Sequence, residues 1–227
     1  MSAASSTQSA DLGRADPAGL LGAVRWRAMW AELGRKQADE ALRLQLLACY
    51  SEPGRSYHSL QHLEECMFTL QPLRPLAEHA AEIELALWFH DAIYDTRRKS
   101  NEERSAQWLR ESAIAAGVPE AAVQRAQAMV LATRHQALPV TPDEKILIDV
   151  DLSILGAGPE RFKQYEEQVQ REYAWIPEVQ RREGRTRILL SFLQREFIYN
   201  TETMRQRLES RARANLCASL AALDAPL

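Results

Sequence analysis

"LALWFHDAIYD", residues 85–95, carries a strongly apolar run directly into a histidine and an aspartate. A buried carboxylate without a partner costs several kcal/mol, or its pKa shifts until it is neutral. His90 and Asp91 follow the apolar run at once, so we expect both to be buried and to have a partner. That partner is either a hydrogen-bonding group of the protein or a metal ion.

The rest of the chain has a helical pattern. Leu, Ala, Glu, Gln and Arg dominate, and the alternation of β-branched residues that is typical of strands is scarce. Segments with proline and glycine, such as "SEPGRS" at 51–56, separate the helical stretches. Helices are expected near residues 20–34, 36–50, 57–70, 79–94, 101–116, 119–134, 143–155, 159–174, 178–197 and 201–223. The sequence therefore predicts a disordered tail over 1–18 and one compact all-α domain of about ten helices over 19–227.

Length and composition are those of an ordinary globular domain. The chain has 227 residues, of which 46% are hydrophobic and 26% charged, and its net charge is −3. This charge gives no indication of nucleic-acid binding. Acids are interspersed in the basic stretch "RREGRTR" at 181–187, so we interpret it as a solvated helix face.

The three cysteines are Cys49, Cys66 and Cys217, and no CxxC pair is present. This spacing indicates buried thiols in a reducing compartment rather than a disulfide framework or a cysteine zinc site. No run of about 18 apolar residues predicts a membrane span, and the N-terminal segment lacks the pattern of a signal peptide. The cytoplasm is the expected location.

Histidines and aspartates recur in apolar contexts elsewhere. His58 and His62 are four positions apart, so on a helix they share one face. His135 lies in "ATRHQ", and Asp149 and Asp151 lie in "ILIDVDLSILG". Imidazole nitrogen and carboxylate oxygen together suit Fe, Mn, Zn or Co.

Each of these residues also has a structural interpretation. A single helical histidine is more often hydrogen-bonded than a metal ligand, and an aspartate in a helix can cap it or pair with an arginine. His79 is flanked by acids and is interpreted as a surface residue. "HSLQH" at 58–62 has Ser59 where the zinc-protease motif HExxH has glutamate, which argues against a metallopeptidase.

The order histidine, His-Asp, aspartate resembles the HD-domain superfamily of metal-dependent phosphohydrolases. The resemblance implies a helical domain around one divalent ion (Mn, Fe, Zn, Co, Ni or Mg). The ligands that it implies are His62, His90, Asp91 and Asp151. In the superfamily a small apolar residue usually follows the first histidine by four positions, and Cys66 fits that place for His62. Asp151 is preferred because it opens the step "DLSILG", and Asp149 stays the alternative.

Longer strings are similar to a bacterial subfamily of predicted metal-dependent HD phosphohydrolases. They include "GRSYHSLQHL", "WFHDAIYD", "NEERSA" and "GRTRILLSFLQREFIY", and the resemblance covers about residues 25–220. One departure concerns the general acid. Many HD phosphohydrolases have an acid or a lysine three residues after the HD aspartate, whereas this chain has Tyr94 there. Asp95 and Glu102 are the nearest acids that follow.

The function that the resemblance implies is hydrolysis of a small phosphate ester, with nucleotides among the candidates. The expected catalytic residues are Asp95, Glu102 and His135, and the expected substrate-binding residues are Arg55, His58, Arg134 and Arg185. Arginine suits phosphate because its planar fork can bond two oxygens.

Two other functions stay open. One is an HD-like module that binds a metal or a nucleotide without turnover. The other is a di-iron oxygenase, for which His58 and His135 would be the additional ligands. A homodimer is the base-rate expectation for the assembly.

Overall fold

The computed structural model describes residues 18–224 of the chain. These residues form helices and no strand, which confirms the predicted all-α class and a bundle of about ten helices. Residues 1–17 of the predicted disordered tail lie outside the described residues, and Ala18 already begins the first helix. No helix within the described range combines the length and the apolar character that crossing a membrane requires.

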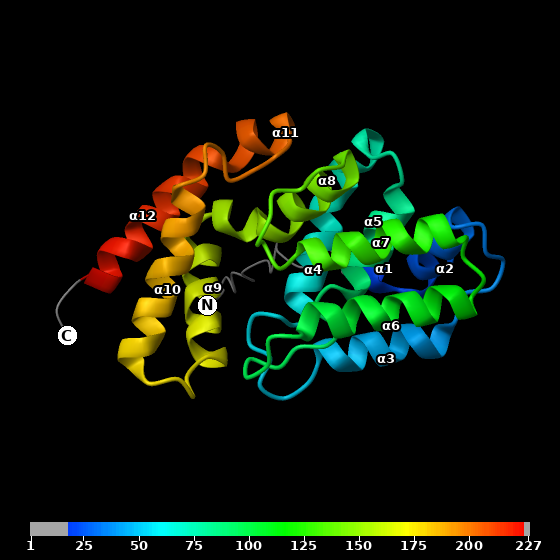
Figure 1. The fold of residues 1–227 in the computed structure, drawn as a ribbon, viewed down its shortest axis with the longest axis horizontal. Helices are drawn as coiled ribbons and strands as arrows, with labels where there is room; N and C mark the ends of the chain where they lie inside the picture. The colour runs from blue at the N-terminus through cyan, green and yellow to red at the C-terminus, as the bar shows by residue number, and fades with distance from the viewer. Residues whose placement is uncertain (1–17, 225–227) are drawn as a thin grey trace, which may run out of the picture.

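The helices follow one another with short connections (Figure 1). The α-helices are α1 (Ala18–Leu21), α2 (Ala23–Glu32), α3 (Glu40–Tyr50), α4 (Leu60–Leu70), α5 (Ala80–Phe89), α6 (Asn101–Ala115), α7 (Glu120–Ala132), α8 (Pro142–Asp151), α9 (Pro159–Glu172), α10 (Glu178–Leu193), α11 (Glu202–Met204) and α12 (Ser210–Asp224). Two 3-10 turns, η1 (Gln71–Leu76) and η2 (Leu152–Gly156), and a π-helical turn, η3 (Arg205–Glu209), complete the elements.

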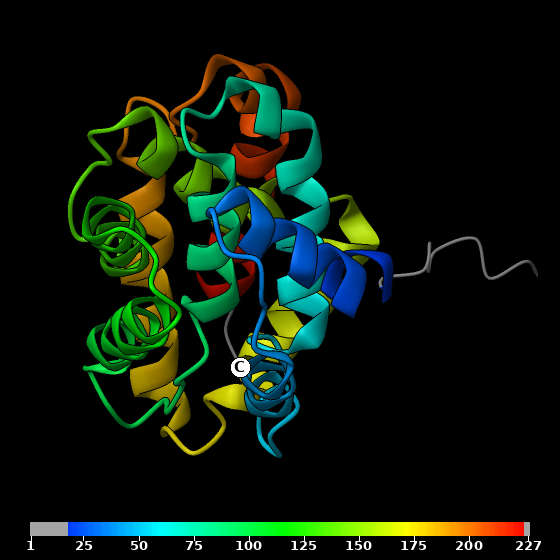
Figure 2. The same cartoon turned by 90° about the vertical axis from the view of Figure 1, so that its right-hand side faces the viewer.

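The bundle has two halves. Helices α2 to α7 lie on one side, α9, α10 and α12 lie on the other, and α8 lies between them (Figures 1 and 2). Helix α5 packs against α4, α7 and α8, while α9 and α12 both pack against η2. The turn from α8 into η2 therefore joins the halves.

Helix α5 is the centre of the first half. Residues 81–89 are all buried, as expected for a helix that is apolar on every side. Its two glutamates are compensated: Glu84 pairs with Arg25 and Arg74, and Glu82 pairs with Arg125. The decisive stretch of sequence thus forms the most deeply buried helix of the bundle.

Helix α5 ends five residues before the predicted boundary at 94. Its last residue is Phe89, and the chain turns away at His90 and Asp91. Arg55 holds this turn by donating to the carbonyls of Asp91 and Ala92 at 2.5 and 2.8 Å. The tertiary hydrogen bonds to this turn explain why local pattern placed the end of the helix too late.

Two further boundaries differ for local reasons. Helix α3 begins at Glu40 rather than 36, because the side chain of Asp39 caps it by accepting from the Leu42 N–H at 3.1 Å. The segment "QPLRP" at 71–75, which lies between the helices predicted near 57–70 and 79–94, forms part of the 3-10 turn η1. The helix predicted to start near 143 begins at Pro142, where Thr141 and Glu144 form a capping box.

Candidate metal centre and its cavity

Two histidines and two aspartates converge where α4, α5 and α8 meet. The His62 and His90 Nε2 atoms are 3.0 Å apart. Oδ2 of Asp91 lies 3.0 Å from the His90 Nε2, and Oδ1 of Asp151 lies 3.2 Å from the His62 Nε2. Both histidines are buried. The structure thus gathers all four residues that the resemblance implied as ligands.

The protonation of His90 can be read from its surroundings. Its Nδ1 is 2.8 Å from the Leu87 carbonyl, which can only accept, so Nδ1 carries the proton. When an ion replaces the second proton of this ring, the Nε2 can offer an electron pair on the side of the His62 Nε2 and of two carboxylates. Nitrogen and oxygen acceptors that face one another in this way fit a divalent ion, which neutral imidazoles and carboxylates bind directly.

Tyr50 supports this arrangement from behind. Its hydroxyl lies 3.5 Å from the His90 Nδ1 and accepts from the Asp91 N–H at 3.2 Å. Tyr50 is fully buried in α3. Hydrogen bonds of this kind fix the orientation of ligand side chains and often matter as much as the ligands.

A thiol belongs to the same cluster. The Cys66 Sγ lies one helical turn after His62 and 3.7 Å from its Nε2. Within the described chain, one ligand atom from each of His62, Cys66, His90 and Asp151 lies within 4.8 Å of the other three. From the sequence, Cys66 was expected to be a buried thiol and to fill the place of the small apolar residue four positions after His62, and no cysteine metal site was predicted. The spacing His-x-x-x-Cys on one helix also puts the thiol next to the imidazole, which that interpretation did not consider.

The charges of the cluster stabilise one another. Burial would raise the pKa of Asp91, but the neighbouring His90 and His58 lower it. Burial would also raise the pKa of Asp151, and hydrogen bonds from His135 and His62 lower it well below its usual value. In the opposite direction, the Asp91 carboxylate overcomes the effect of burial and raises the pKa of His90 to about 9. The carboxylates are therefore ionised at neutral pH, as metal ligands must be.

The two aspartates of α8 have different roles. Asp149 is fully buried and accepts from the backbone N–H groups of Asn200 and Thr201 at 2.6 and 2.7 Å. The Asn200 amide and the Thr201 hydroxyl also donate to it. Asp149 thus holds the segment before α11, whereas Asp151 faces the histidines.

His135 extends the cluster on the other side of Asp151. Its Nε2 is 3.1 Å from the Asp151 Oδ2, and its Nδ1 is buried without a hydrogen-bond partner in the described chain. Its backbone has a φ of 57°, in the left-handed region that a non-glycine residue seldom adopts. The strained turn after α7 therefore places the imidazole against the carboxylate.

His58 is positioned by a glutamate that the sequence analysis did not identify. The Glu172 Oε2 lies 2.7 Å from the His58 Nδ1, and its Oε1 accepts from the backbone N–H groups of Ser56, Tyr57 and His58. The His58 ring also stacks on Tyr94, with ring centroids 4.0 Å apart. No local pattern could reveal Glu172, because it lies at the end of α9.

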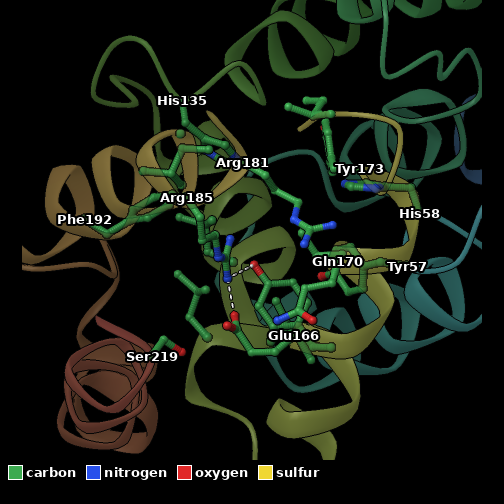
Figure 3. Close-up of a pocket in the computed structure, with 18 of the residues that line it drawn as sticks. Tyr57, His58, His135, Glu166, Gln170, Tyr173, Arg181, Arg185, Phe192 and Ser219 are labelled. Atoms are coloured by element: carbon green, nitrogen blue, oxygen red, sulfur yellow. Dashed lines mark hydrogen bonds and ion pairs between the residues drawn. The ribbon is translucent and has the colours of Figure 1, made fainter. Parts of the chain in front are cut away.

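A cavity of about 710 Å³ opens between the two halves of the bundle at this cluster (Figure 3). Asp91, Asp151, His58 and His135 are among the residues that line it. Aromatic and aliphatic side chains form much of the wall, among them Tyr57, Tyr165, Tyr173, Phe192, Leu155, Val169 and Ile188. A cavity of this size can hold a small organic molecule next to the candidate metal ligands.

The three arginines that were expected to bind substrate have different surroundings. Arg55 does not line the cavity, since its guanidinium is committed to the carbonyls of the turn at Asp91. Arg134 lines the cavity and pairs with Glu103. Arg185 also lines it and bonds Glu166 and Tyr165.

The two acids expected as catalysts also differ. Glu102, at the start of α6, lines the cavity. Asp95 does not; it is 42% exposed and accepts from the Arg97 backbone and the Arg98 side chain. Only Glu102 of this pair can therefore contact a molecule in the cavity.

No model of a known protein family, no curated protein and no solved structure matches the chain. The assignment of the site therefore rests on its own geometry.

Proposed function

We propose that this protein is a metal-dependent phosphohydrolase that cleaves a small phosphate ester, with nucleotides among the candidate substrates. The observation that carries the proposal is the convergence of the His62 and His90 Nε2 atoms with Asp91 and Asp151 at the end of a cavity. Because both carboxylates also line that cavity, a bound ion would be open to a ligand. An open coordination position distinguishes catalytic sites from structural ones. Membership of the HD-domain superfamily is part of this proposal.

His62, His90, Asp91 and Asp151 would hold the ion, with Cys66 beside them. A divalent ion in such a site supplies Lewis acidity for a phosphoryl oxygen and makes water more acidic. Two neutral imidazoles and two carboxylates balance the charge of one divalent ion. This balance favours a single ion of the Mn, Fe, Zn, Co, Ni or Mg group.

His58 is the group best placed to donate a proton to the leaving oxygen. Glu172 accepts a hydrogen bond from the His58 Nδ1, which leaves the Nε2 of that ring to exchange a proton with a ligand of the cavity. Burial would lower the pKa of His58, but Asp91 and Glu172 raise it, which favours the protonated form of a general acid. Glu172 acts through His58 and is a positioning residue. This pair would take the place of the acid that the HD pattern usually has where Tyr94 stands.

His135 and Glu102 are the other cavity residues that can hold protons. His135 contacts Asp151, and its Nδ1 has no partner in residues 18–224. The di-iron alternative would need a second group of ligands around Asp151. The commitment of His58 to Glu172 argues against that arrangement and in favour of one ion.

Metal content measured by elemental analysis tests the proposal first. Wild type, His90→Ala and Asp91→Asn are purified without chelator and supplied with Mn, Co, Ni, Zn, Fe or Mg. We expect about one ion per wild-type chain and little in either variant. Asp39→Asn is the matched control for Asp91→Asn, because Asp39 caps α3 and belongs to no group of possible ligands in the described chain. An equal metal content in Asp91→Asn and Asp39→Asn would contradict the metal centre.

Hydrolysis of aryl phosphates and nucleoside monophosphates then separates an enzyme from a binding module. We expect turnover in the metal-loaded wild type that is lost in Asp91→Asn. A protein that binds one ion but hydrolyses none of these esters would favour the non-catalytic alternative. A cytoplasmic location and a homodimer both stay predictions.

A further inference from the structure

Arg181 differs from the other arginines around the cavity. Arg185 bonds Glu166 and Tyr165, and Arg134 pairs with Glu103. The guanidinium of Arg181 has neither an ion pair nor a hydrogen bond to any residue between 18 and 224. It is only partly exposed, and it lines the cavity. A guanidinium without a partner in the protein leaves five donors to be satisfied by solvent or by a ligand.

The direction of the side chain sets Arg181 apart from Arg185. The two residues are four positions apart in α10 and therefore share one face of that helix. Arg185 turns toward Glu166, whereas Arg181 extends into the cavity toward Gln170 and Tyr173 (Figure 3). The sequence analysis singled out Arg185 and placed the stretch 181–187 on a solvated face, so the structure reassigns part of it to the cavity.

We infer that Arg181 is an anion-binding residue of this cavity and that its ligand is an organic phosphate with an aromatic or apolar body. A guanidinium without a carboxylate partner favours an anion that brings two oxygens, which phosphate and phosphonate groups do. The apolar body follows from the wall, where Leu155, Val169, Ile188 and Phe192 face the same space.

The inference rests on the proposed function, since it names the substrate class of the same cavity. The two proposals depend on different parts of the structure: the metal centre is formed by residues at α4, α5 and α8, whereas the anion site is formed by a residue of α10. The unfolding temperature and metal content of Arg181→Gln should be close to those of wild type, because its side chain gives up no hydrogen bond or ion pair with residues 18–224.

Phenylphosphonate is a suitable probe because its P–C bond resists ester hydrolysis, so binding can be measured whether or not the protein is an enzyme. Titration calorimetry is carried out on the metal-loaded full chain. We expect Arg181→Gln to weaken binding about tenfold or more, since hydrogen bonds to a charged group are lost. Arg181→Lys should recover part of that loss, because lysine keeps the charge without the fork. Methylphosphonate should bind the wild type more weakly than phenylphosphonate.

Arg187→Gln is the matched control, because Arg187 lies in the same helix, is exposed and does not line the cavity. Equal affinities of Arg181→Gln and Arg187→Gln for phenylphosphonate would overturn the inference, as would wild type that binds no phenylphosphonate. Binding that depends on Arg181 in a protein that hydrolyses no ester would uphold the anion site and contradict the enzyme. If Arg181→Gln hydrolyses an ester with the KM of wild type, the enzyme would be upheld and the anion site at Arg181 contradicted.

Discussion

Glu172 holds His58 by a 2.7 Å contact between Oε2 and Nδ1, although 114 positions separate the two residues. The same carboxylate accepts three backbone N–H groups at residues 56–58 through its other oxygen. One side chain of α9 therefore fixes both the loop before α4 and the tautomer of a cavity histidine. This link joins the two halves of the bundle directly at the candidate active site.

Replacement of Glu172 should reveal this positioning role. In Glu172→Gln the amide can still accept from the backbone, but the negative charge that raises the pKa of His58 is lost. If His58 donates a proton, we expect kcat to fall about 100-fold and the alkaline limb of its pH profile to move to lower pH. KM and metal content should change little. An unshifted pH profile with a merely lower unfolding temperature would reduce Glu172 to a structural residue.

The two aspartates of α8 should separate stability from metal binding. Asp149→Ala removes the buried acceptor of the Asn200 and Thr201 N–H groups, so we expect a loss of about 3 kcal/mol in the free energy of unfolding. Asp151→Ala should lose the bound ion instead. Urea unfolding and elemental analysis of both variants measure the two effects. The reverse result, metal loss in Asp149→Ala alone, would transfer the ligand role to Asp149.

The metal-free protein should lose stability as pH rises through the range in which His90 titrates. Asp91 raises the pKa of His90 from 6.5 to about 9 in the folded state, so its contribution is complete below about pH 6.5 and is lost toward pH 9. The loss is at most about 3 kcal/mol. In acid, Asp91 and Asp151 have lowered pKa values, so their contribution is present above about pH 4 and is lost below it.

Urea unfolding with and without chelator from pH 4 to 9 measures this dependence. The metal-loaded protein should keep its stability at pH 9, because a bound ion replaces the proton on His90. His90→Gln provides the control, since its metal-free stability should fall less between pH 6.5 and 9, and the decline that remains belongs to His58, whose pKa is also raised. A decline of equal size in that variant would assign the effect to another group.

The sequence predicted those parts of the fold and site that depend on local pattern. The apolar run at 85–89 and the helical pattern sufficed to predict the helical class and a buried His90 and Asp91, whereas the choice of His62 and Asp151 came from the resemblance to the HD-domain superfamily. Helix-period patterns report burial, and a polar residue inside one must find a partner. That reasoning requires no knowledge of how the helices pack.

The features that the sequence could not reveal depend on packing between distant helices. Glu172 and Arg181 lie in α9 and α10, whose basic and acidic residues read as ordinary solvated faces. Arg55 is the opposite case, a residue that was expected to bind substrate phosphate and does not face the cavity. Its guanidinium instead donates to the backbone carbonyls of the turn after α5. Which charges face a cavity is decided by the angle between helices, and one sequence does not contain that angle.

Cys66 should influence which metal the site selects. Its thiol lies 3.7 Å from the His62 Nε2, and burial raises its pKa well above the usual value, so it stays neutral without a metal. A bound ion would favour the thiolate, which is a softer ligand than carboxylate and favours Zn, Fe or Co over Mg. We expect the Co(II)-loaded wild type to show a near-ultraviolet sulfur-to-cobalt absorption band that is absent in Cys66→Ser. Cys49→Ser is the control, because Cys49 lies in α3 outside the cluster. Identical spectra for wild type and Cys66→Ser, with one cobalt bound in each, would show that Cys66 is not a ligand and that the histidines and aspartates alone bind the ion.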